Sequence, residues 1–156
     1  MTKEDFLKEA INLAVENVHS GNGGPFGAVV VKDGKIIAKG ANSVTGTHDP
    51  TAHAEIVAIR RACKELDSFQ LADCEIYSSC EPCPMCLGAI YWARPKALYF
   101  AADQKDASSV GFDDSFIYDE LSLPAEQRSI PTYQVNHTEK LRPFKAWEEF
   151  EEKMKY

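Results

Sequence analysis

The sequence predicts an α/β protein in which one mixed sheet of about five strands lies between two layers of helices, a three-layer α/β/α sandwich. Three observations favour this fold class. Two strand patterns flank an Asp-Gly turn, two helix–strand units follow them, and amphipathic helix patterns stand near both ends of the chain. The 156 residues have the length of one domain, so we expect a single domain over residues 1–156.

The first part of the chain predicts a helix and an antiparallel pair of strands. Apolar residues recur on one helical face over residues 3–20. Residues 26–32 and 35–41 predict strands joined by Asp33-Gly34, which is typical of a type I′ hairpin turn. Residues 42–51 are rich in turn-forming residues and predict a loop.

The middle of the chain predicts two helix–strand units. Residues 53–66 have the apolar spacing of a helix, and residues 74–79 predict a short strand. A second helix is expected over residues 85–93, since Pro95 prevents the helical conformation at the residue before it. Residues 97–102 are apolar throughout, which is typical of a strand covered on both faces.

The C-terminal part is less regular. We expect residues 103–131 to form a long irregular segment, and loops of that length are usually functional or disordered. Residues 132–136 predict a final strand, and residues 144–155 predict a helix with its large apolar residues on one side.

Charge and cysteine content restrict the partners and the location. The chain has 17 basic and 24 acidic residues, a net charge of −7, and its basic residues are scattered. This disfavours a nucleic-acid partner, because such binding depends on neutralising phosphates. The absence of any apolar run of roughly 18–20 residues disfavours a membrane partner. An odd number of closely spaced cysteines and no export signal predict a cytoplasmic protein with metal-binding or catalytic thiols: Cys63, Cys74, Cys80, Cys83 and Cys86.

The pattern His53-Ala54-Glu55 followed by Cys83 and Cys86 predicts a metal site. Two cysteines three residues apart in the first turn of a helix point the same way, and the helix N-terminus favours their thiolate forms. With His53 as the third ligand, these side chains suit one Zn²⁺ per subunit, with the fourth position left to water. Glu55 does not share the orientation of His53 along the helix, so we expect it to face that water.

Two alternatives to a catalytic zinc remain open at this point. Cys80 could close the site as a fourth ligand, which would make the chain a non-catalytic structural zinc module. Pro82 separates Cys80 from the helical turn and disfavours that arrangement. The other alternative is a core histidine with inert thiols, and the joint spacing of the two motifs disfavours it.

The pattern His-x-Glu followed by Pro-Cys-x-x-Cys resembles that of the zinc-dependent nucleobase and nucleoside deaminases, in which the Glu is the general acid and base. The resemblance begins at Gly24-Pro25-Phe26-Gly27 and covers most of the chain. Residues 80–95, residues 111–116 and the terminal Tyr156 are most similar to the small guanine deaminases of this superfamily. The resemblance implies a cytidine-deaminase-like fold and the hydrolysis of guanine to xanthine and ammonia.

The resemblance also implies roles for particular residues. Glu55 would transfer a proton from water to the purine ring. Asp114 would accept hydrogen bonds from the N1–H and amino groups of guanine and relay a second proton. Whether Asp113 or Asp114 faces the site is left open by the sequence, because either could instead form a turn.

The remaining implied contacts concern the purine base, the expected small-molecule partner. Phe26 and Trp92 would stack on the ring, Asn42 would bind its other edge, the Ala54 N–H would bind a ring heteroatom, and Tyr156 would close the pocket. Each also has an ordinary structural explanation, as a core residue, a turn former or a chain end.

The family resemblance further implies a homodimer in which residues of about 132–156 are exchanged between subunits. A deaminase of tRNA adenosine, cytosine or cytidine is the alternative within the superfamily. A tRNA enzyme should carry a basic surface, which the net charge of −7 disfavours.

Overall fold

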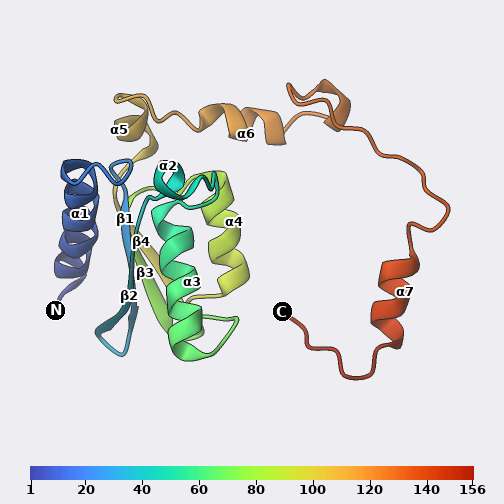
Figure 1. Cartoon of the computed structure of the whole chain (residues 1–156), viewed down its shortest axis with the longest axis horizontal. Helices are drawn as coiled ribbons and strands as arrows, with labels where there is room; N and C mark the ends of the chain where they lie inside the picture. The colour runs from blue at the N-terminus through green and yellow to red at the C-terminus, as the bar shows by residue number, and fades with distance from the viewer. The chain divides into compact units, whose positions relative to one another are not determined.

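The computed structural model describes all 156 residues, and it divides into two compact units, Met1–Ser115 and Phe116–Tyr156 (Figure 1). The helices of the first unit are α1 (Lys3–His19), α2 (Val44–Thr47), α3 (Ala54–Leu66), α4 (Pro84–Ala93) and α5 (Gln104–Ser108). Its strands are β1 (Gly27–Lys32), β2 (Lys35–Ala41), β3 (Cys74–Cys80) and β4 (Ala97–Ala102). Apart from α2 and α5, which were not predicted, these bounds agree closely with the predicted elements of this region.

The sheet is mixed, as predicted, and its strand order is β2-β1-β3-β4. Strand β1 is antiparallel to β2 and β3, whereas β3 and β4 are parallel. Asp33 and Gly34 both have positive φ, 50° and 73°, which confirms the expected hairpin turn.

The sheet has four strands and not about five. The predicted fifth strand, residues 132–136, is irregular and belongs to no sheet. Tyr133 and Val135 supplied its alternating pattern, but they are 72% and 77% exposed. That pattern therefore has neither a paired neighbour nor a covered face in this chain, and both are needed to stabilise a strand.

Helices cover both faces of the sheet in the first unit, which confirms the three-layer sandwich (Figure 1). Side chains of a strand point alternately to its two faces. Ala28 and Val30 of β1 pack with α3 and α4, while Val29 and Val31 pack with Phe6 of α1. The two clusters are the two halves of the core.

Strand β4 is not covered on both faces, contrary to the prediction. It lies at the edge of the sheet, and Phe100 is 43% exposed. Tyr99 stacks on the buried Tyr77 at a ring distance of 4.9 Å, so one face of β4 is packed against the core. An apolar run does not distinguish a central strand from an edge strand.

Residues 42–51 and 103–131 contain more helix than predicted. The first segment includes α2, and the second includes α5, α6 (Ser115–Leu121) and the 3₁₀ helix η1 (Ala125–Gln127). The last helix, α7 (Arg142–Glu149), is shorter than the predicted 144–155. None of the helices is both long and apolar enough to cross a lipid bilayer.

Candidate functional site

Two helix N-termini bring the three predicted metal ligands together. His53 is the N-cap residue of α3, Cys83 is the N-cap residue of α4, and Cys86 lies in the first turn of α4. The sulfur atoms of Cys83 and Cys86 each lie 3.5 Å from His53 Nδ1. All three ligand atoms are within 4.8 Å of one another, which is close enough to share one ion.

The backbone of α3 reaches the sheet because Gly40 of β2 has no side chain. A Cβ atom at Gly40 would lie 2.4 Å from the carbonyl oxygen of Ala54 and 2.6 Å from the amide nitrogen of Ala58. Both atoms belong to the backbone of α3, so they cannot rotate away. The glycine therefore fixes how closely the start of α3, and with it His53, approaches the sheet.

The two cysteines share one negative charge in the metal-free protein. The Cys86 thiol donates a hydrogen bond to Cys83, and this bond, with one from His53, lowers the pKa of Cys83 to about 4. The same bond and burial raise the pKa of Cys86. The hydrogen bond with Cys83 in turn raises the pKa of His53. A thiolate beside a second thiol and an imidazole is a prepared site for a divalent cation.

Glu55 lies beside this group but is not a member of it. Its side chain is only 6% exposed, and the hydroxyl of Ser78 in β3 donates a 3.2 Å hydrogen bond to Glu55 Oε1. Burial raises the pKa of Glu55. A buried carboxyl with a raised pKa can hold a proton at a pH where an exposed carboxyl has lost it.

The donor set fits a catalytic zinc rather than a closed structural site. One imidazole nitrogen and two sulfurs supply three of the four positions of a tetrahedral shell. Cys80 is not part of the group: its thiol lies 3.7 Å from the carbonyl oxygen of Asp103. Burial raises the pKa of Cys80 to about 11, so this side chain remains a neutral thiol. The residues present therefore fit one Zn²⁺ with three protein ligands.

Asp113 and Asp114 have different surroundings. Asp113 is exposed, and its Oδ1 accepts a hydrogen bond from the backbone N–H of Ser115. Asp114 is half-buried, and its Oδ1 accepts a 2.8 Å hydrogen bond from Gln104. The negative charge of Asp114 also contributes to the raised pKa of His53, after the hydrogen bond with Cys83 and the charges of Cys83 and Glu55.

Three of the residues expected to contact the purine ring also lie in the first unit: Asn42, Phe26 and Ala54. Asn42 Oδ1 accepts a 3.3 Å hydrogen bond from the backbone N–H of Val44, so its side chain also stabilises the start of α2. Phe26 packs edge-on against Phe112, with a ring distance of 5.0 Å. Ala54 is the first residue of α3, directly after His53, and is fully buried.

Trp92 and Tyr156 are not members of the metal-ligand group. Trp92 is 61% exposed and lies in the last turn of α4, at the end opposite Cys83. Tyr156 is the last residue of the second unit. The proposed contacts of these two residues with substrate remain predictions.

Three residues near the site were missed by the sequence analysis. They are Asn17, Ser78 and Gln104. Asn17 is buried in α1, and its Nδ2 donates 2.8 Å hydrogen bonds to the carbonyl oxygens of both Gly24 and Asn42. The signal was present, because Asn17 is a polar residue within the apolar stripe of the N-terminal helix, and Ser78 lies in an otherwise buried strand.

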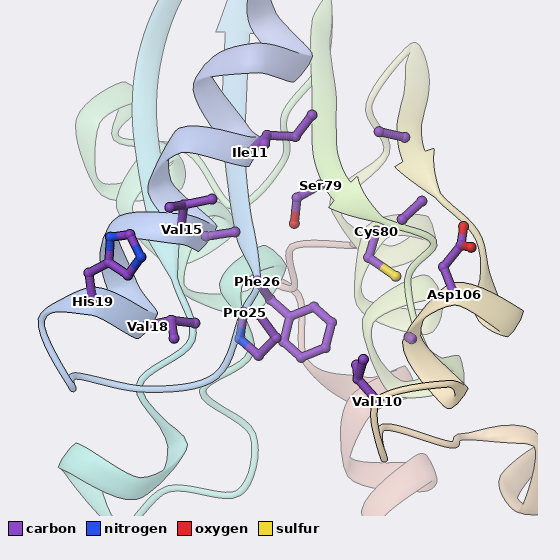
Figure 2. Close-up of a pocket in the computed structure, with 14 residues that line it drawn as sticks. Ile11, Val15, Val18, His19, Pro25, Phe26, Ser79, Cys80, Asp106 and Val110 are labelled. Atoms are coloured by element: carbon purple, nitrogen blue, oxygen red, sulfur yellow. The ribbon is translucent and has the colours of Figure 1, made fainter.

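An apolar cavity of about 550 Å³ opens on the α1 face, at the C-terminal ends of β3 and β4 (Figure 2). Figure 2 shows Phe26 and Cys80 on its wall, together with Ile11 and Val15 of α1. None of the three metal ligands lines this cavity.

Comparison with known proteins agrees with this geometry. Residues 1–102 match the family described as the cytidine and deoxycytidylate deaminase zinc-binding region. The chain therefore belongs to this family of zinc-dependent deaminases, whose fold is the α/β/α sandwich described above.

The similarity to individual proteins is more informative than the family match. The chain is 64% identical to the guanine deaminase of Bacillus subtilis (strain 168) over 156 residues, which is the full length of both proteins. A crystal structure of guanine deaminase from Bacillus subtilis has a TM-score of 0.99 and 63% identity, and the match covers 100% of this chain and 99% of that one. The tRNA-specific adenosine deaminase of Aquifex aeolicus is 44% identical over 111 residues, 70% of this chain and 73% of that protein.

Proposed function

We propose that this chain hydrolyses guanine to xanthine and ammonia. The observation that carries the proposal is the buried Glu55 beside the His53–Cys83–Cys86 group. The full-length similarity to a guanine deaminase supports guanine as the substrate. A purine base as ligand is further supported by a related solved structure in complex with 8-azaguanine, at 37% identity and a TM-score of 0.69 over 72% of this chain and 65% of that one.

His53, Cys83 and Cys86 would hold the Zn²⁺ ion. When bound, the ion would supply a water molecule acidic enough to be a nucleophile near pH 7. Glu55 would take a proton from the attacking water and deliver it to ring nitrogen N3 of guanine. Its burial and its hydrogen bond from Ser78 suit it to both steps, because the carboxyl must alternate between charged and neutral forms.

Asp114 would recognise the edge of guanine that carries the N1–H and the amino group. Both are donors, and an ionised carboxylate is an acceptor only. Asp114 would then pass a second proton to the amino group, which leaves as ammonia. Asn42 and the N–H of Ala54 would bind other polar atoms of the ring. Phe26 would stack on its face.

Two further contacts complete the proposed site. Trp92 would stack on the ring opposite Phe26, and Tyr156 would close the pocket. Both assignments follow from the family resemblance: Trp92 lies at the end of α4 opposite Cys83, and Tyr156 belongs to the second unit.

The proposal is tested by measuring ammonia release from guanine, adenine, cytosine, their nucleosides and tRNA, with zinc quantified per chain. We expect release from guanine and about one zinc per chain. Release from tRNA or cytosine but not from guanine would show that guanine is not the substrate. No release from any of them by zinc-loaded protein would instead support a non-catalytic zinc module.

We also propose a cytoplasmic homodimer in which the C-terminal segment, residues of about 132–156, is exchanged. All five cysteines are free, which suits a reducing compartment. The second unit buries no side chain in a core of its own, and its large apolar residues are exposed: Phe144, Trp147, Phe150 and Met154 among them. Large apolar side chains exposed in this number favour a surface that covers them. Light scattering of the full chain should give twice the monomer mass, and a monomeric mass would overturn the proposal.

A further inference from the structure

Gln104 joins the segment between β3 and α4 to Asp114 through two hydrogen bonds. Its backbone N–H donates to Glu81 Oε1 at 3.0 Å, and its side-chain Nε2 donates to Asp114 Oδ1 at 2.8 Å. Glu81 lies two residues before the metal ligand Cys83, and its own backbone N–H donates to the carbonyl oxygen of Ala102 at 2.8 Å. Gln104 therefore contacts both the segment that precedes the metal ligand Cys83 and the proposed substrate-binding residue Asp114.

The backbone of Gln104 is firmly placed. It is the first residue of α5, and a capping box secures the start of this helix. Asp103 Oδ1 accepts from the N–H of Asp106, and Asp106 Oδ2 accepts from the N–H of Asp103, each at 2.9 Å. Reciprocal caps of this kind satisfy two N–H groups that the helix leaves free.

The backbone of Asp114 has no such support. It follows Gly111, whose φ of +96° ends the compact turn after α5, and it precedes α6 in a segment without regular structure. The half-buried hydrogen bond from Gln104 is therefore the contact that sets the direction of the Asp114 carboxylate.

The side-chain amide of Gln104 also determines which oxygen of Asp114 is free to exchange a proton. The NH₂ group of glutamine can only donate, so it binds a carboxylate oxygen that carries no proton. With Oδ1 held in this way, Oδ2 is the oxygen that would exchange a proton with the substrate. We propose that Gln104 is a positioning residue that presents Asp114 to the guanine base, an inference that rests on the proposed function.

The test is a double-mutant cycle on the zinc-loaded full-length protein. Gln104→Leu keeps a similar volume but loses the donor, and we expect kcat/KM for guanine to fall about 10-fold, the usual order for a hydrogen bond to a charged group. Gln127→Leu, at an exposed glutamine in η1, is the matched control and should leave kcat/KM unchanged.

The cycle separates positioning from a merely structural role. In an Asp114→Ala background, Gln104→Leu should have no further effect, because the residue through which it acts is gone. Gln104→Glu, which has no N–H to donate and places a second carboxylate beside Asp114, should lower kcat/KM at least as much as Gln104→Leu. Independent effects in the double variant, or wild-type activity in Gln104→Leu, would overturn the proposal.

A measurement without substrate distinguishes this proposal from the proposed function. Amide hydrogen exchange over residues 110–115 should be faster in Gln104→Leu than in wild type and unchanged in Gln127→Leu. If wild type releases no ammonia from guanine, the proposed function fails whatever the exchange shows. If guanine is deaminated and exchange in Gln104→Leu equals that of wild type, the positioning role is wrong.

Discussion

The hydroxyl of Ser78 donates a 3.2 Å hydrogen bond to Oε1 of Glu55, and both side chains are buried. This contact joins β3 to α3 and fixes the carboxyl beside the metal ligands. Because a hydroxyl is neutral and can both donate and accept, it can stay bonded whether Glu55 is charged or protonated. The arrangement suits a group that transfers protons.

Replacing Glu55 by Gln should abolish most turnover while keeping zinc. We expect kcat for guanine to fall about 10²–10⁴-fold, the usual contribution of general acid–base catalysis. Zinc content, measured by atomic absorption, should stay at the wild-type value because Glu55 is not in the ligand group. Near-wild-type turnover would refute the role of Glu55.

Glu55→Gln should also change how the stability of the metal-free protein depends on pH. Burial raises the pKa of Glu55, so the folded state binds this proton more tightly than the unfolded chain does. Stability of the wild type therefore falls as pH rises above the ordinary carboxyl pKa. Glu55→Gln removes this dependence, and thermal melts at pH 5 and pH 8 should show a smaller difference than in wild type.

Zinc removal should expose one unusually reactive thiol. The hydrogen bond from Cys86 lowers the pKa of Cys83 to about 4, whereas burial raises the pKa of Cys80 to about 11. Since the thiolate is the nucleophile, iodoacetamide at pH 6 should label Cys83 in the metal-free protein well before Cys80. Peptide mass spectrometry measures this, with zinc-loaded protein as the protected control. Equal labelling of the two would contradict the charge assignment.

Gly40→Ala should damage the site through the backbone. Its Cβ atom would lie 2.4 Å from the Ala54 carbonyl oxygen, so α3 must shift. We expect a loss of about 1–3 kcal/mol in the free energy of unfolding, together with weaker zinc binding. Gly88→Ala is the matched control, because nothing lies within 4 Å of the added atom in α4. That variant should be more stable by about 0.5–1 kcal/mol.

Asn17→Ala should loosen the loop before β1 and the end of β2. It removes the donor shared by the carbonyl oxygens of Gly24 and Asn42. Leaving such groups unpaired costs about 1–3 kcal/mol in the free energy of unfolding. Asn12→Ala, at an exposed position of the same helix, should change stability by no more than about 0.5 kcal/mol. Chemical denaturation compares them, and equal values would show that the Asn17 bonds add nothing.

The regular part of the fold and the metal ligands could be predicted because each depends on local patterns. The Asp33-Gly34 turn, the Pro84 start of α4 and the Pro95 stop act within a few residues. The supporting contacts depend on distant segments instead: Ser78 with Glu55, and Asn17 with Asn42, are 23 and 25 residues apart. The false strand at residues 132–136 had the right alternation but no partner.

The central claim is that three side chains hold one zinc ion and leave one position for water. X-ray absorption spectroscopy at the zinc edge of the loaded, full-length protein measures the ligand set directly. We predict two sulfur neighbours at about 2.3 Å and two nitrogen or oxygen neighbours at about 2.0–2.1 Å. A third sulfur neighbour, or a shell that is unchanged in Cys83→Ser, would contradict the account.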